Sequence, residues 1–106
     1  MKICIAASSL DLNSSVNRVF ARCAYFLIVD SETGKFKTVV NKAKETERGA
    51  GFAAAKTVAN LGVQVIICGS IGPNAQMVLE QSGIKVISEF SGIAKEALEK
   101  FKTGKI

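Results

Sequence analysis

The sequence predicts an α/β fold: one three-layer domain in which a five-stranded mixed sheet is flanked by helices. Short apolar runs rich in β-branched residues alternate with segments in which apolar residues recur at helical spacing. Glycines and polar clusters separate these segments, as expected for turns. The 106 residues fit a single domain over 1–106, with no repeat and no internal linker to divide it.

Three strands are predicted in the first half of the chain. Two of them form a β-hairpin, because a turn with Gly34 late in it separates two β-branched and aromatic runs. In order, the predicted elements are strand 2–7, loop 8–15, strand 25–30, turn 31–35, strand 36–40 and a charged surface segment 41–48.

Helices and strands alternate in the second half. Phe52 and Val58 belong to a set of apolar residues at helical intervals, and Gly62 follows as a helix stop. The nearly continuous apolar run 63–68 predicts a central strand covered on both faces. The remaining predicted elements are helix 51–61, turn 69–74, helix 75–82, strand 84–87 and an amphipathic helix 93–101. Such alternation predicts right-handed parallel crossovers, with the hairpin as the antiparallel part of the sheet.

Composition excludes several classes of protein. Apolar residues make up 48% of the chain and charged residues 22%, as in soluble globular proteins. No apolar run approaches the roughly 20 residues that span a bilayer, and no cleavable signal is visible, so we expect no membrane partner and a cytoplasmic protein.

The net charge of +5 favours a solvated lysine-rich surface over an anionic partner. No nucleic-acid-binding motif is present. A domain this small gains stability from pairing, so a homodimer is possible.

Histidine is absent, and three cysteines occur without a CxxC pair. The chain therefore has no Ser-His-Asp or Cys-His catalytic set and lacks the commonest nitrogen ligand for zinc or iron. An odd number of cysteines fits reduced thiols better than a disulfide framework. Acid–base groups are few, with Asp11 and Asp30 the only aspartates. We expect a protein that is not an enzyme.

The turn Gly69–Asn74 is the best candidate for a ligand-binding surface. It follows a buried strand, and ligands of open α/β sheets bind beyond the carboxyl ends of such strands. The loops after residues 2–7 and 84–87 should meet it there. Pro73 suits a first helical position, while Gly69 and Gly72 would let a ligand approach the backbone. The helix start then offers free N–H groups to an anion. A tight structural turn is the equal alternative, because the P-loop lysine and hydroxyl residue are missing.

Two cysteines and two arginines are further candidates. Cys68 ends the buried strand before the turn and is a candidate metal ligand or a small core residue. Cys23 follows Arg22, a basic setting that favours thiolate, although an unreactive thiol is a nearly equal alternative. Cys4 lies inside the first strand and is predicted to be core. Arg18 and Arg22 would neutralise an anion if the loop before the second strand folds over the site, and otherwise they are exposed basic residues. The glycine pair in residues 49–51, where the first helix opens, also allows a close approach, although helix N-capping without a ligand is the simpler interpretation.

Four segments resemble the dinitrogenase iron–molybdenum cofactor biosynthesis family over nearly the whole chain: 17–26 (NRVFARCAYF), 49–51 (GAG), 69–75 (GSIGPNA) and 83–86 (GIKV). The resemblance implies a ribonuclease-H-like motif without ribonuclease activity. It also implies binding or carriage of iron–sulfur or iron–molybdenum–sulfur precursors during metallocofactor assembly. Val19 stands where the family usually has a histidine, and Ala21 where it has glycine, so one metal ligand of the family is missing. Cys23 is a nearby thiol that would substitute for it.

Together these observations predict a small binding or carrier protein for an iron–sulfur or iron–molybdenum–sulfur cluster or its precursor, with metallocofactor assembly proteins as partners. The alternatives are a cofactor-free interaction or regulatory module of the same fold and a binder of a small phosphorylated ligand. The predicted cofactor-binding residues are Phe20, Arg22, Gly69, Ser70, Gly72 and Asn74, and the predicted metal ligands are Cys23 and Cys68.

Overall fold

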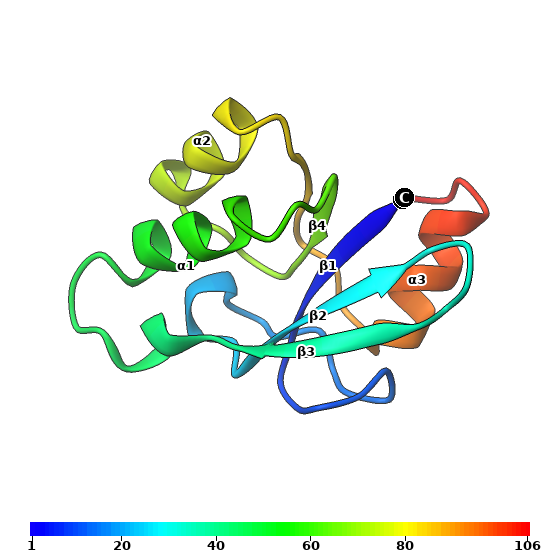
Figure 1. Cartoon of the computed structure of the whole chain (residues 1–106). Coiled ribbons are helices and arrows are strands. Elements are labelled where there is room, and N and C mark those ends of the chain that lie inside the picture. The colour runs from blue at the N-terminus through cyan, green and yellow to red at the C-terminus, as the bar shows by residue number, and fades with distance from the viewer.

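The computed structural model describes residues 1–106 as a five-stranded sheet with the strand order β3-β2-β1-β4-β5. Figure 1 shows the strands and the three α-helices around them. In chain order the elements are β1 (Lys2–Ala7), the short 3-10 helix η1 (Phe20–Arg22), β2 (Tyr25–Asp30), β3 (Phe36–Val40), the 3-10 helix η2 (Lys42–Glu45), α1 (Ala50–Ala59), β4 (Val65–Ile67), α2 (Pro73–Gln81), β5 (Lys85–Ile87) and α3 (Ala94–Lys102).

The central strand β1 joins the two halves of the sheet. It pairs antiparallel with β2, which pairs antiparallel with β3, and it pairs parallel with β4, which pairs parallel with β5. The sheet is therefore mixed, as predicted, with the hairpin as its antiparallel half. The strand β4 is buried along its whole length, which confirms a central strand covered on both faces.

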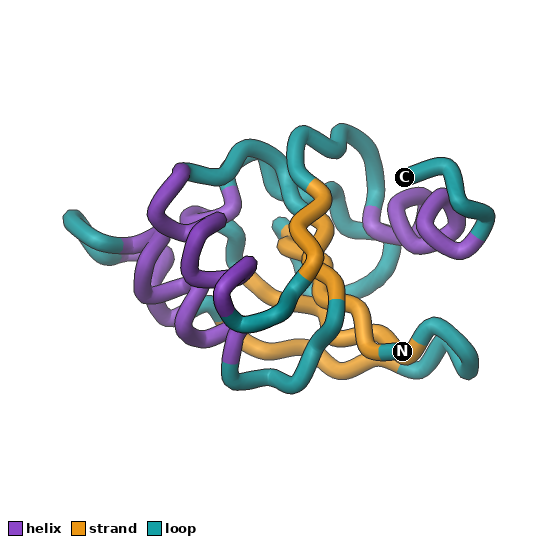
Figure 2. The backbone as a smooth tube through the Cα atoms, turned by 90° about the horizontal axis from the view of Figure 1, so that it is seen from above, coloured by secondary structure: helices purple, strands orange, loops and turns teal.

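Helices cover both faces of the sheet (Figure 1, Figure 2). Alternating β1 side chains contribute to two separate cores: Cys4 and Ala6 pack in the core beneath α1 and α2, whereas Ile3, Ile5 and Ala7 pack with α3. This is the consequence of side chains pointing to opposite faces along a strand. The predicted three-layer α/β architecture is confirmed. None of the helices has the length and apolar character needed to cross a membrane.

One prediction about an individual residue is wrong. Phe52 has the spacing of a core residue but is 49% exposed, since α1 begins at Ala50 and turns this side chain toward solvent. Residues 41–48 lie mostly at the surface, as predicted, with Asn41 and Ala43 as two buried exceptions. They are buried because η2 folds back against α1 and η1.

Candidate functional site

The predicted turn opens onto a hollow of about 270 Å³ between the first turns of α1 and α2, which we call the α1–α2 groove. It unites three segments that are distant in sequence. Its lining consists of residues 19–21, 49–52 and 70–75. Four of the predicted cofactor-binding residues line it: Phe20, Ser70, Gly72 and Asn74.

Both helices begin at this groove without a capping side chain. The N-cap residues are Gly49 for α1 and Gly72 for α2, and neither has a side chain that can accept from the first-turn amides. The first backbone bonds of the two helices are donated by Ala53 to Gly49 and by Gln76 to Gly72. The N–H groups that precede these bonds, in residues 50–52 and 74–75, therefore have no partner within their helices.

The electrostatics of the groove favour an anion. Neither helix has an acidic residue in its first turn. The helices approach closely, since a Cβ added at Gly51 would lie 3.5 Å from the Cβ of Ala75. The partial positive charges of two helix N-termini thus fall on one small hollow, and an anion placed there interacts with both.

The two glycines of the turn have different roles. A Cβ at Gly69 would overlap with the carbonyl oxygens of Asn17 and Arg18, so this glycine serves close packing of backbone against backbone. That Gly69 also lets a ligand approach stays a prediction. At Gly72 the backbone has φ −75° and ψ 160°, which any residue adopts, and a Cβ would meet nothing within 4 Å. Gly72 leaves open space at the groove.

Hydrogen bonds to residues 18–20 fix the turn in place. The Ser70 N–H donates to the Arg18 carbonyl at 2.8 Å, and the Phe20 N–H donates to the Ser70 carbonyl at 2.9 Å. The Ser70 hydroxyl also donates to the Arg18 carbonyl, at 3.0 Å. Ser70 therefore positions the turn, and its hydroxyl proton is already used. Phe20 is 1% exposed and packs on Phe26 with ring centroids 5.8 Å apart, so it forms the apolar floor of the groove.

Arg22 does not line the groove, contrary to its predicted role. Its guanidinium Nη1 donates to the carbonyl oxygens of Lys44 and Thr46, at 2.7 and 2.8 Å. These bonds hold the segment that leads into α1. Arg18 lies instead beside an adjoining hollow of about 400 Å³, together with Gly69 and Glu89.

The three loops expected to meet at this end of the sheet do meet. The Val16 N–H donates to the Gly92 carbonyl at 2.8 Å, and the Glu89 N–H donates to the Gly69 carbonyl at 2.9 Å. Glu89 has a φ of 61°, a left-handed conformation that is uncommon for a residue other than glycine. The adjoining hollow shares Val19 and Ser70 with the α1–α2 groove, so the two form neighbouring compartments of one surface.

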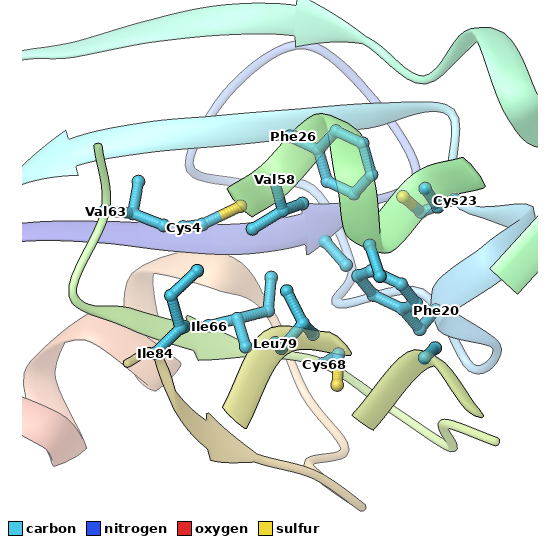
Figure 3. Close-up of a cluster of buried hydrophobic side chains, with 14 of the residues drawn as sticks. Cys4, Phe20, Cys23, Phe26, Val58, Val63, Ile66, Cys68, Leu79 and Ile84 are labelled. Atoms are coloured by element: carbon cyan, nitrogen blue, oxygen red, sulfur yellow. The ribbon is translucent and has the colours of Figure 1, made fainter. Parts of the chain in front are cut away.

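All three cysteines are buried in the core beneath α1 and α2, as Figure 3 shows, and none lines the groove. Burial raises the pKa of Cys23 from its ordinary value of 9.0 to about 12, although a hydrogen bond from Asn41 opposes the rise. Burial, and then the charge of Glu89, raises the pKa of Cys68 to about 12 as well. The expectation of a Cys23 thiolate in a basic setting is wrong, because the thiol points inward and the Arg22 guanidinium is bound elsewhere.

The thiols do not form a metal site as they stand. No group of three or more cysteine or acidic residues lies close enough to hold a metal ion. Cys4 is buried and its pKa is also raised, first by burial, which confirms it as a core residue. Protonated, buried thiols are poor ligands, since the thiolate is the form that binds metal.

Asn41 and Phe52 were not identified as site residues from the sequence. The Asn41 amide, 3% exposed, donates to the carbonyls of Ala21 and Cys23 at 3.1 and 2.9 Å, and it accepts from the Ala43 N–H. It therefore joins η1, at the floor of the groove, to η2. Phe52 lines the groove at its exposed edge, with the Lys56 Nζ 5.1 Å from its ring centroid. The sequence signal that could have identified Phe52 was its position directly after Gly51, at the start of the first helix.

Comparisons with known proteins match this chain to a family model, a curated relative and solved structures of the same fold. The family model described as dinitrogenase iron-molybdenum cofactor matches residues 1–104. An uncharacterised protein of Methanocaldococcus jannaschii is 35% identical over 97 residues, which cover 89% of this chain and 82% of that protein. Among solved structures, the apo form of the orange protein from Desulfovibrio gigas has a TM-score of 0.93 and 32% identity, covering 98% of this chain and 88% of its own. A NifB-like protein from Thermotoga has a TM-score of 0.83 and 32% identity, with coverages of 98% and 89%.

Proposed function

Because the chain belongs to the dinitrogenase iron–molybdenum cofactor family, we propose that the α1–α2 groove carries an anionic iron–sulfur or iron–molybdenum–sulfur cluster, or a precursor of one, as its cargo. The convergence of two uncapped helix N-termini on one hollow is the observation that supports this function most directly. The orange protein supports it as well, since a relative with the same fold was solved in an apo form.

The groove suits a cargo that brings its own metal ligands. Concave arrangements of backbone N–H groups bind phosphates and surround many iron–sulfur sites. Here the amides of residues 50–52 and 74–75 would donate to the sulfur or oxygen atoms of the cargo, and Phe20 and Phe52 would cover its apolar flanks. Gly72 would leave the room that the cargo needs.

Cys23 and Cys68 do not fit as ligands in this arrangement. Clusters that are bonded to protein are normally held by thiolates. These thiols are buried, have a raised pKa and lie outside the groove lining. We therefore propose binding through amide hydrogen bonds and shape. A cargo that has no coordination bond to a protein side chain can be passed on to an assembly partner without ligand exchange at its metals.

The proposed role is that of a cytoplasmic carrier rather than an enzyme. The three free cysteines suit a reducing compartment. The groove lining contains no acidic residue and no group that titrates near neutral pH. Metallocofactor assembly proteins, which supply or receive the cargo, are the proposed partners.

Anaerobic incubation with iron and sulfide, with and without molybdate, tests this function. Iron and molybdenum retained after gel filtration are measured for the wild type, for Gly72→Asp and for Cys23→Ala/Cys68→Ala. Gly72→Asp should lose the metal, because an aspartate at the N-cap accepts from the α2 amides and repels an anion. The double alanine variant should retain it. Retention by Gly72→Asp with loss in the double variant would contradict the proposal and support thiol ligation.

A second arm of the experiment tests phosphate-containing anions, which would bind the same backbone amides as the metal–sulfur cargo. Inorganic phosphate and nucleotides would use the same amides if the groove bound a phosphorylated ligand. Thermal unfolding in their presence should show no stabilisation at concentrations at which the metal–sulfur cargo is retained. Stabilisation by a nucleotide in the absence of metal binding would replace the proposed cargo with that ligand.

A further inference from the structure

The edge strand β3 leaves one row of backbone groups without a partner. Lys35 and Asn41, on either side of β3, hydrogen-bond to the β2 side: the Asp30 N–H donates to the Lys35 carbonyl, and the Asn41 N–H donates to the Ala24 carbonyl. Because hydrogen-bonded positions alternate along an antiparallel pair, Phe36, Thr38 and Val40 direct their N–H and C=O groups away from β2. No backbone hydrogen bond from these three N–H groups to a loop is present.

The two faces of this edge differ in chemistry. Val29 pairs with Phe36 and Leu27 with Thr38, so Phe36, Thr38 and Val40 share the face covered by α3. On that face Phe36 is 40% exposed and Val40 57% exposed. Lys37 pairs with Ile28 and lies on the opposite face. The edge is therefore apolar on one side and basic on the other.

Positive charge is concentrated around this edge. Residues 35–44 contain four lysines and no acidic residue, namely Lys35, Lys37, Lys42 and Lys44. A hollow of about 250 Å³ beside the strand is lined by Lys2, Lys35 and Lys37, with Asp30 as its only acid. The Asp30 carboxylate already accepts from the N–H groups of Glu32 and Thr33, at 2.8 and 3.3 Å, in the hairpin turn. Its charge is thus partly engaged by these N–H groups, and it also interacts with Lys2, so Lys35 and Lys37 are left without an acidic partner of their own.

We propose that the edge of β3 docks an extended segment of a partner protein in which acidic and apolar residues alternate. Such a segment adds a sixth strand, a known mode of peptide recognition in which main-chain bonds give affinity and alternate side chains give specificity. Its apolar side chains lie against Phe36 and Val40, and its carboxylates lie beside Lys37 and reach the lysine-lined hollow.

Charge also argues against a second copy of this chain as the occupant. Pairing two β3 strands would bring the lysines of both copies into one seam, and like charges across strands are destabilising. Lysines on an edge strand are a common device against self-association. The other edge strand, β5, has only three residues, and its Val86 and Ile87 are half-buried, so it offers less surface to a partner.

A titration with a designed peptide tests the docking. The probe is an acetylated, amidated peptide of alternating glutamate and valine, added to the full chain labelled with nitrogen-15. We expect the amide resonances of Phe36, Thr38 and Val40 to shift and their hydrogen exchange to slow. Lys37→Glu should weaken binding by at least about fivefold, because it replaces an attraction across strands with a repulsion. The matched control Lys85→Glu, the same charge change on β5, should leave the affinity within about twofold.

Three results would overturn the proposal. One is the absence of amide shifts in β3 at about 1 mM peptide, because a specific complex should have a dissociation constant no weaker than this concentration. Another is equal weakening by Lys37→Glu and Lys85→Glu, which would reduce the interaction to net charge. The third is sedimentation of the wild type as a dimer whose protected amides are those of β3, which would make a second copy the occupant. Because β3 and the α1–α2 groove share no residue, failure here leaves the proposed cargo unaffected.

Discussion

At the scale of single residues, Gly69 and Gly72 show that two glycines of one sequence motif can have different structural roles. Gly69 allows the strand end after β4 to pass against the backbone of residues 17–18. Gly72 has an ordinary conformation and open space around its Cα. Stability therefore depends on the first glycine, whereas the proposed cargo depends on the second.

Alanine substitutions separate these two roles. Gly69→Ala should lower the free energy of unfolding by about 1–3 kcal/mol, the usual effect of overpacking. Gly72→Ala should change it by no more than about 0.5 kcal/mol, because the poorer N-capping by alanine is offset by the lower conformational freedom that alanine gives the unfolded chain. Urea unfolding of the two variants measures both values. Equal losses of stability would show that the turn is structural throughout.

The buried thiols predict how stability depends on pH. Folding raises the pKa of Cys23 and Cys68 from 9.0 to about 12, so their contribution to stability is fully present below pH 9.0 and is lost as the pH rises toward 12. In that range the unfolded chain releases protons that the folded chain retains. Urea unfolding should therefore show a fall in the free energy of unfolding above pH 9.0. The fall should be smaller in Cys23→Ala/Cys68→Ala, and parallel curves for the two proteins would contradict it.

At the scale of elements, the segment from η2 to α1 is held by long-range bonds rather than by its own propensity. Arg22 donates to the carbonyls of Lys44 and Thr46, and Asn41 joins η1 to η2. This segment sets where α1 begins. The position of one half of the groove therefore depends on two side chains that do not line it.

Removal of the Arg22 side chain should loosen the start of α1. Arg22→Ala loses two hydrogen bonds at an exposed position, so we expect a stability loss of about 1 kcal/mol. Hydrogen exchange should become faster at the amides of residues 46–53. Arg18→Ala is the control, because it removes the same charge from an exposed arginine whose side chain makes no hydrogen bond. Faster exchange in both variants would indicate an effect of charge instead.

Substitution of Asn41 should be more damaging than substitution of Arg22, because its amide is buried. Asn41→Ala leaves the Ala21 and Cys23 carbonyls and the Ala43 N–H without this partner. We expect the free energy of unfolding to fall by about 1–3 kcal/mol, the cost of unsatisfied buried polar groups. Thermal or urea unfolding measures it. A loss smaller than that of Arg22→Ala would mean that water replaces the amide.

At the scale of the whole molecule, the alternation of strand-like and helical segments, together with the hairpin, was sufficient to predict the layers and the mixed sheet. Periodicity records which face of an element is buried, and the sheet follows from it. Periodicity does not show which side chains contact each other when they are far apart in sequence. Arg22 contacts residues more than 20 positions away, and Cys23 points into the core although its neighbour is basic. The turn was therefore predictable as part of the candidate site, whereas the hydrogen bonds of Arg22, the close packing of Gly69 and the burial of the thiols were not.

The most direct test of the account is a nitrogen-15 titration of the wild type with tetrathiomolybdate, a small anion of molybdenum and sulfur. The account predicts that the largest shifts fall on the first-turn amides of both helices, residues 50–52 and 74–75, and that Gly72→Asp abolishes them. Sulfate at the same concentration should produce weaker shifts, because the groove has the volume and apolar floor for a larger anion. Shifts confined to one helix, or shifts that persist in Gly72→Asp, would contradict a binding site made by the two helix N-termini together.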